Sequence, residues 1–167
     1  DTLHIKEGGD YYSISLNKKT HFNSFLNIGD DLTITGDASD FNNTLHFKGR
    51  GEVTNNYLIT RPKEVALFTA DLSSLYALDS IYFNANVDGF SEKMTALLAV
   101  EKMDSTVIKR EENGLKGFVM SLKTRYKREH TLLVAFKEGT VSPKFRDFEN
   151  FNGGTTSLDD LLGKYVY

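Results

Sequence analysis

The hydrophobic pattern of this chain changes period near Gly51, and this change limits the folds that the chain can adopt. Before Gly51, apolar and polar residues alternate in short runs that end at turn-forming residues, and Tyr12, Ile14 and Leu16 show the alternation clearly. After Gly51, apolar residues recur every three or four positions, as in amphipathic helices. Strands followed by helices are typical of the α+β class.

Short strands are expected throughout residues 1–51, at residues 2–6, 12–16, 22–28, 32–35 and 45–48. Runs of this length, separated by turn signals, favour a small antiparallel sheet or a partial sandwich. Because a lone small sheet is unstable in water, one face needs a cover. We therefore expect residues 52–138 to form a helical hairpin or bundle packed on the strands.

The helical region contains several start and stop signals. We expect Pro62 to interrupt a first short helix and to begin a new one, because proline fits best in a first turn. Residues 73–77 are expected to be a connector that leads to the next helix. Asp79 is a candidate N-cap for a long helix that contains Gly89, and a second long helix is expected to start at Asp104 or Ser105. The short link between these two helices favours an antiparallel hairpin.

Composition excludes several classes of function. The 167 residues carry a net charge of −3 without a basic block, which argues against a nucleic-acid-binding protein. No apolar run is long enough to span a bilayer. Cysteine is absent, so this chain has no thiol chemistry of its own, no sulfur-bound zinc and no disulfide. We expect this chain not to be an enzyme.

Residues that often bind metals do not have the spacing of a metal site. The histidines have no neighbouring ligand at helical or hairpin spacing, and they are His4, His21, His46 and His130. The aspartates around the fourth strand do not match a calcium loop and are expected to form turns; they are Asp30, Asp31, Asp37 and Asp40. The sequence assigns no metal-binding residue.

Other candidate motifs are also incomplete. The run Lys48-Gly49-Arg50-Gly51 is only part of a dinucleotide fingerprint, whose third glycine would fall at Thr54. We expect its glycines to let the chain leave a strand and enter a helix. The Asn42-Asn43-Thr44 sequon is interpreted as a turn, Ser157 lies in no nucleophile motif, and residues 109–112 are expected to be a solvated helix face. No catalytic or cofactor-binding residue is assigned.

The C-terminal residues 139–167 differ in character from the rest. They contain Ser142-Pro143, Phe145, Gly153-Gly154, a Ser157-Leu158 turn with Asp160 and Leu161, and Gly163-Lys164 before Val166. This pattern resembles the entry into a thioredoxin-like domain of the membrane-associated thiol-disulfide exchange type. In that family a short strand and a Trp-Cys-x-x-Cys motif follow, so residues 139–167 are expected to be a linker and a thioredoxin-like stub.

Residues 1–6, 28–34 and 41–58 resemble the domain that precedes the thioredoxin-like domain in envelope proteins of the Bacteroidetes type. The most specific part is residues 41–51 followed by Asn55-Asn56-Tyr57-Leu58. In such proteins further strands usually precede the segment that matches Asp1, so the small sheet here is expected to expose an edge.

The resemblance implies a parent protein in the periplasm or cell envelope that exchanges disulfides through a low-pKa thiolate. This chain would anchor or orient the catalytic domain, or select its clients. Its partners would be its own C-terminal thioredoxin-like domain, client proteins or a second copy. Membrane contact would come only through a lipid anchor outside this chain. The reading frame is expected to reach Trp-Cys-x-x-Cys within about twenty residues of Tyr167.

An alternative hypothesis is a freestanding envelope module that binds a peptide or a glycan through its sheet. It predicts an exposed, concave aromatic patch formed by Tyr11, Phe22 and Phe47.

Overall fold

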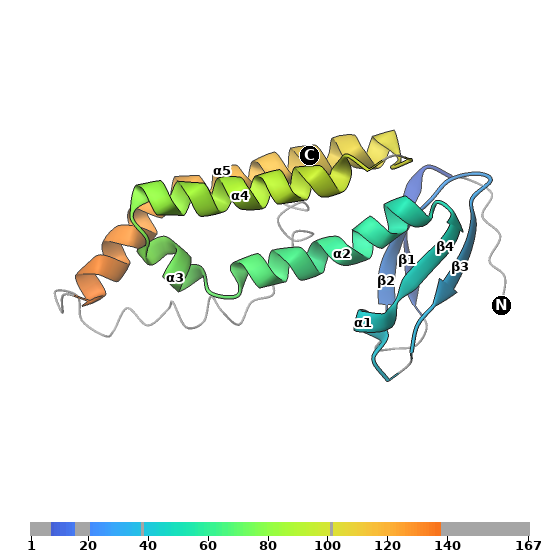
Figure 1. Ribbon diagram of the computed structural model, residues 1–167, viewed down its shortest axis with the longest axis horizontal. Coiled ribbons are helices and arrows are strands. Elements are labelled where there is room, and N and C mark those ends of the chain that lie inside the picture. Colours follow the sequence, from blue (N-terminus) through green and yellow to red (C-terminus); the bar gives the residue numbers. More distant parts are fainter. Residues whose placement is uncertain (1–7, 16–20, 38, 101, 138–167) are drawn as a thin grey trace. The chain divides into compact units, whose positions relative to one another are not determined.

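A computed structural model describes residues 8–15, 21–37, 39–100 and 102–137 (Figure 1). Its strands are β1 (Asp10–Ser15), β2 (His21–Leu26), β3 (Asp31–Thr35) and β4 (His46–Arg50). Its helices are α1 (Phe41–Thr44), α2 (Glu52–Thr69), α3 (Leu72–Ala77), α4 (Ser80–Leu98) and α5 (Ser105–Lys137). The order of strands before long helices confirms the α+β class.

The four strands form two separate antiparallel hairpins. Strand β1 pairs with β2, and Tyr11 lies opposite Phe25. Strand β3 pairs with β4, and Ile34 lies opposite Phe47. The strands expected near residues 12–16, 22–28, 32–35 and 45–48 are therefore confirmed. The strand expected at residues 2–6 and the thioredoxin-like stub at 139–167 lie outside the described residues.

Helix α1 is a single turn in a region where the sequence predicted only strands and turns. The Thr44 hydroxyl donates to the Asp40 carbonyl at 2.7 Å and accepts from the Asp37 amide at 2.7 Å. Local side-chain bonds of this kind offer the backbone an alternative to a strand ladder. The Asn42-Asn43-Thr44 sequon thus lies in this helical turn.

Two expectations about the first helices were wrong. Helix α2 continues through Pro62 instead of stopping there. Leu58, Arg61 and Val65 are all buried and lie at helical spacing on both sides of the proline, so packing outweighs its cost. The expected connector at residues 73–77 is helix α3, because the Asp71 carboxylate caps it by accepting the Ser74 amide at 2.8 Å.

The two long helices begin where the sequence predicted. The Asp79 carboxylate accepts the amides of Ile81 and Tyr82 at 3.0 and 3.1 Å at the start of α4. The Asp104 carboxylate accepts the amides of Thr106 and Val107 at 2.8 and 3.2 Å at the start of α5. Asp79 and Asp104 therefore act as N-caps.

The chain divides into two compact units. Unit 1 comprises Asp1–Lys63 and Ala96–Glu111, and unit 2 comprises Glu64–Thr95 and Glu112–Tyr167. The domain boundaries expected at residues 51 and 138 stay predictions. None of the helices in the described part of the chain is both long and apolar enough to cross a membrane.

Each unit has its own core. In unit 1, Phe22, Leu45 and Phe47 form a buried cluster that Leu32 of β3 and Ile59 of α2 also contact. In unit 2, aromatic rings dominate. Phe68 stacks on Phe90 with ring centroids 4.1 Å apart, and Phe83 stacks on Tyr76 and Tyr126. Phe83 meets Tyr126 and the later Phe90 meets the earlier Phe118, so α4 and α5 run antiparallel in this unit, as predicted.

Candidate functional site

Two consecutive asparagines in the first turns of α2 hold one edge of each hairpin. The Asn55 amide accepts the Phe25 N–H and donates to the Phe25 carbonyl, both at 2.9 Å. The Asn56 amide does the same to Phe47, at 3.0 and 2.9 Å. Each side chain therefore takes the place of a neighbouring strand at one residue. We call Asn55 and Asn56 the asparagine clasp.

Asn55 is fully buried, so its polar atoms depend on protein partners. Besides the bonds to Phe25, it accepts from the Ser24 hydroxyl at 2.7 Å and donates to the Gly51 carbonyl at 3.0 Å. One side chain thus joins strand β2 to the turn that starts α2. This arrangement offsets the cost of burying an amide.

The glycine turn between β4 and α2 brings the clasp to the strands. Gly49 has a φ of +111°, and a Cβ there would lie 2.0 Å from the Asp31 carbonyl oxygen. Gly51 has a φ of +98° beside the Asp30 carboxylate. Only glycine fits these conformations without strain. The prediction that these glycines let the chain leave a strand and enter a helix is confirmed.

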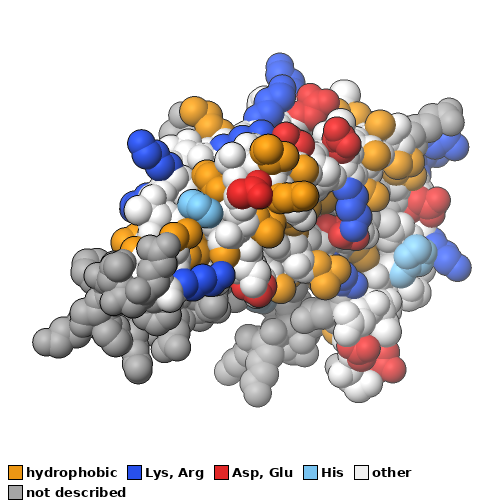
Figure 2. Space-filling view, turned by 60° about the vertical axis from the view of Figure 1, so that its left-hand side comes forward, with side chains coloured by type: hydrophobic (Ala, Val, Ile, Leu, Met, Phe, Trp, Pro, Cys, Tyr) orange, Lys and Arg blue, Asp and Glu red, His pale blue; other side chains and the backbone are white. Residues whose placement is uncertain are grey.

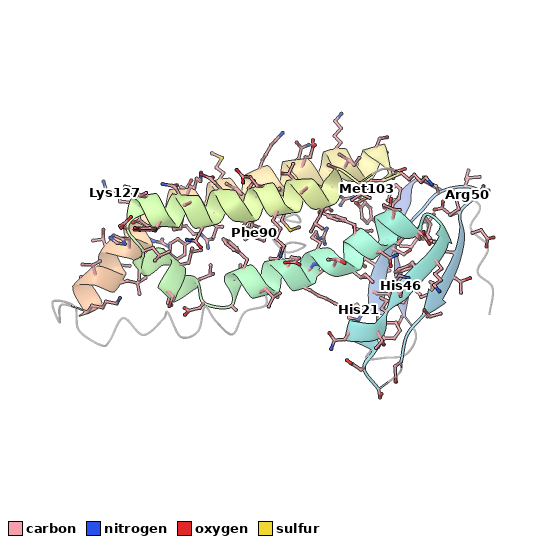
Figure 3. The ribbon with its side chains drawn as sticks, in the orientation of Figure 1. His21, His46, Arg50, Phe90, Met103 and Lys127 are labelled. Carbon is pink, nitrogen blue, oxygen red and sulfur yellow. The ribbon has the colours of Figure 1, made fainter. Side chains whose placement is uncertain are left out.

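Residues of the glycine turn form hydrogen bonds with other groups of this chain. The Gly49 amide donates to the Glu52 carboxylate at 2.9 Å. The Arg50 guanidinium, labelled in Figure 3, donates to the Gly29 carbonyl at 2.9 Å. The turn is therefore built around internal contacts that link the two hairpins of unit 1.

A buried ion pair links α2 to the first turns of α5 within unit 1. The Arg61 guanidinium lies 2.6 Å from the Glu111 carboxylate, and the two side chains are 6% and 2% exposed. The Tyr57 hydroxyl donates to the other Glu111 oxygen at 3.0 Å. Burial and the nearby Glu111 carboxylate raise the pKa of Tyr57, so the hydroxyl stays a donor. We call Tyr57, Arg61 and Glu111 the buried ionic cluster.

The buried ionic cluster corrects one interpretation. Residues 109–112 were expected to be a solvated helix face, but Glu111 is buried because Arg61 and Tyr57 supply its partners. Its neighbours Lys109, Arg110 and Glu112 are exposed, as expected.

Tyr11 lies beside this cluster rather than in an open patch. Its ring packs edge-on against Phe25 with centroids 5.1 Å apart, and the Arg110 guanidinium carbon lies 4.5 Å from the ring centre. Burial raises the pKa of Tyr11 to about 12, and the Glu111 carboxylate adds to the effect. The tyrosine is thus part of the packing between β1, β2 and α5 in unit 1.

The aromatic patch expected for a freestanding binding module is not present. Phe22 and Phe47 are 8% and 0% exposed, and Tyr11 is half-buried. Phe22 and Phe47 lie on the apolar face of the hairpins and pack with Ile59 of α2, so both rings belong to the core of unit 1. The alternative hypothesis therefore loses the surface on which it depended.

Three of the clustered aspartates, Asp30, Asp37 and Asp40, lie in turns, as predicted. The prediction was wrong for Asp31, which is the first residue of β3 and pairs with Arg50 of β4. The Asp30 carboxylate accepts the Asn27 amide at 2.8 Å, and the Asp40 carboxylate accepts from the Asn43 side chain at 2.8 Å. Hydrogen bonds from the side chain and backbone of Ser39 hold the pKa of Asp37 below its usual value. In the ranges that the structure describes, no group of three His, Asp or Glu residues could hold a metal ion.

The histidines lie apart from one another. His21 and His46 are exposed on β2 and β4 (Figure 3), which confirms His46 as a surface residue. The His130 ring stacks on Tyr126 in unit 2, and its Nδ1 lies 2.9 Å from the Tyr76 carbonyl. His4 is outside the described residues.

The charged side chains visible in Figure 2 are of both signs and are interspersed with hydrophobic ones. On this face no region of a single charge stands out.

Sequence reasoning missed the residues that join the elements of unit 1. Asn55, Asn56 and Tyr57 lay in the stretch that carried the resemblance, but nothing nearby in the sequence marks their partners. The partner of Asn56 lies on the preceding strand, and those of Asn55 and Tyr57 are 30 and 54 positions away. Arg61 and Glu111 are separated by 50 positions, and no local pattern links them. A polar residue on the buried face of a helix was the one available signal.

The comparisons with family models, curated proteins and solved structures gave no match to this chain. The arrangement of its side chains therefore has to be interpreted from geometry alone. The clasp, the glycine turn and the buried ionic cluster hold two hairpins, α2 and the start of α5 together within unit 1.

Proposed function

We propose that this chain is the non-catalytic N-terminal domain of a thiol-disulfide interchange protein of the cell envelope. In this role it anchors and orients a following thioredoxin-like domain, or selects clients for it. The proposal rests on the resemblance of residues 41–58 and 142–167 to such proteins. The alternative, a freestanding binding module, has no comparable support.

The observation that carries the proposal is the structural role of the most specific stretch of the resemblance. Residues 41–58 include Gly49, Gly51 and the asparagine clasp, which together connect β2, β4 and α2. These residues build a framework, in which the two clasp side chains bind backbone groups of β2 and β4. A domain that positions a catalytic partner needs such a framework.

The chemistry of exchange would lie outside this chain, which has no cysteine. A thiolate must attack the disulfide of a client, and the attacking sulfur needs a lowered pKa. A Cys-x-x-Cys motif at the start of a helix in the following domain would supply it.

The direct test compares this chain with a longer one in an insulin-reduction assay. The longer protein continues along the natural reading frame through its Cys-x-x-Cys motif. We expect turnover from the longer protein and none from residues 1–167. A matched control, the longer protein with both cysteines changed to serine, is expected to be inactive.

Two results would contradict the proposal. Turnover by the present chain would place chemistry in residues that hold no thiol. An inactive longer protein, correctly folded and with both cysteines reduced, would show that the following domain is not an oxidoreductase.

A further inference from the structure

Strand β3 has a hydrogen-bonded neighbour on one side only. It pairs with β4, and among the described strands none pairs with its other edge (Figure 1). A row of unpaired backbone groups at a sheet edge is a template for another strand.

The register shows which groups of β3 point outward. The amide and carbonyl of Phe47 bind Asn56, and the Gly49 amide binds Glu52, so Phe47 and Gly49 direct these groups away from β3. Residues directly opposite each other in an antiparallel pair share the same bonding type. Their partners Ile34 and Leu32 therefore direct their own amide and carbonyl groups to the free edge.

The free edge is also apolar on one face, and its one charged residue is Asp31 at the start of the strand. Leu32 packs on the unit 1 core, and Ile34 lies on the same face but is 39% exposed. The sequence of β3, Asp31-Leu32-Thr33-Ile34-Thr35, has no lysine or proline to discourage pairing. By contrast, the Tyr11 amide of β1 already has an acceptor, because it donates to the Asp10 carboxylate at 2.7 Å.

We propose that β3 pairs antiparallel with β3 of a second copy of this chain, around a two-fold axis at Thr33. In this register Leu32 of each copy lies opposite Ile34 of the other, and their outward amides and carbonyls exchange hydrogen bonds. Both exposed Ile34 side chains are then covered by a continuous apolar face. Asp31 lies opposite Thr35, so no like charges face each other.

The self-complementary register is the reason to expect a second copy. An isologous contact requires one patch to match itself, and β3 does so in both hydrogen bonding and charge. This inference does not depend on the proposed function, because it concerns unit 1 alone.

The test is the mass of the 167-residue chain, measured by sedimentation equilibrium over a range of concentrations, in the wild type and in Thr33→Glu. In each copy the new carboxylate lies opposite Lys48 of β4, which favours the monomer fold. Across the dimer axis it lies opposite the same carboxylate. We expect Thr33→Glu to raise the dimer dissociation constant by at least about tenfold.

Three further samples make the test specific. Thr33→Gln, similar in size but neutral, is expected to dimerise like the wild type. An equimolar mixture of Thr33→Glu and Thr33→Lys is expected to form a heterodimer, because opposite charges meet at the axis. Ile34→Pro removes one outward amide at an edge position that tolerates proline, and it is expected to be monomeric.

A wild-type chain that stays monomeric at all concentrations would overturn the proposal. So would a dimer whose dissociation constant is the same in Thr33→Glu and Thr33→Gln. Circular dichroism melting curves establish that each variant is folded before its mass is interpreted.

Discussion

Asn55 makes four hydrogen bonds at a fully buried position, to Ser24, both backbone groups of Phe25, and Gly51. Removing it leaves buried backbone groups without partners, which costs more than the bonds themselves contribute. We expect Asn55→Ala to lower the free energy of unfolding by about 3 kcal/mol. Urea denaturation followed by circular dichroism measures this change.

Asn84 provides the control for Asn55. It lies exposed on α4 and donates to the Ser80 carbonyl at 2.7 Å. Asn84→Ala is expected to change stability by less than about 0.5 kcal/mol, as for most surface positions. Equal effects of the two substitutions would mean that the clasp does not hold the hairpins.

The buried ionic cluster leads to a second residue-level prediction. Arg61→Met leaves the Glu111 carboxylate buried without its cation, and we expect a loss of about 3–5 kcal/mol. The double variant with Glu111→Leu as well removes both charges and is expected to recover most of this loss. A double-mutant cycle by urea denaturation checks the prediction, and a double variant no more stable than Arg61→Met would contradict it.

Asp104 gives a prediction of pH dependence. Partial burial acts to raise its pKa, but hydrogen bonds from the Asn27 side chain and the Val107 and Thr106 amides outweigh burial, and the pKa lies below 3.8. The unfolded chain therefore binds this proton more readily than the folded one. The stabilisation by the carboxylate is present above pH 3.8 and is lost as the pH falls through the folded pKa.

The measurement for Asp104 is the stability of the wild type and of Asp104→Asn between neutral pH and the lowest pH at which both fold. The difference between the two proteins is expected to shrink as the pH falls. A difference that stays constant would show that the carboxylate charge contributes nothing at the start of α5.

At the scale of elements, we expect alanine substitutions at two glycines to change stability in opposite directions. Gly89 lies in α4, and a Cβ there would meet nothing within 4 Å, so Gly89→Ala is expected to stabilise the fold by about 0.5–1 kcal/mol. Gly49→Ala is expected to destabilise it, because its φ is +111° and the new methyl would clash with the Asp31 carbonyl. Thermal melting of both variants tests the pair, and a destabilising Gly89→Ala would contradict the account of α4.

The elements that the sequence predicted correctly are those specified by local signals. A cap at Asp79 or Asp104 followed by a helical stripe such as Phe83, Val87 and Phe90 contains its own start and buried face. The alternation of Tyr12 and Ile14 likewise indicated β1. Local periodicity was sufficient in these segments because no distant contact opposed it.

The elements that the sequence predicted wrongly are those in which a contact outweighed a local rule. Pro62 is a helix breaker by its covalent structure, yet the buried residues around it keep α2 continuous. Helix α3 is six residues long and depends on the Asp71 cap, too short for periodicity to reveal. The clasp depends on strands that must already be in place.

At the scale of the whole molecule, the chain consists of two compact units that each carry a core. Composition alone shows that this chain has no thiol, because the cysteine content does not depend on the fold. The long-range partners within each unit could not be predicted, since the 50 positions between Arg61 and Glu111 contain no signal that relates them.

We propose that this chain belongs to an envelope thiol-disulfide interchange protein whose reactive cysteines lie in a following domain. The most direct measurement is the nucleotide sequence of the natural reading frame beyond the codon for Tyr167. The resemblance implies a Trp-Cys-x-x-Cys motif within about twenty codons, and we predict that the reading frame contains it. A stop codon at that point, or a continuation without paired cysteines, would contradict the claim.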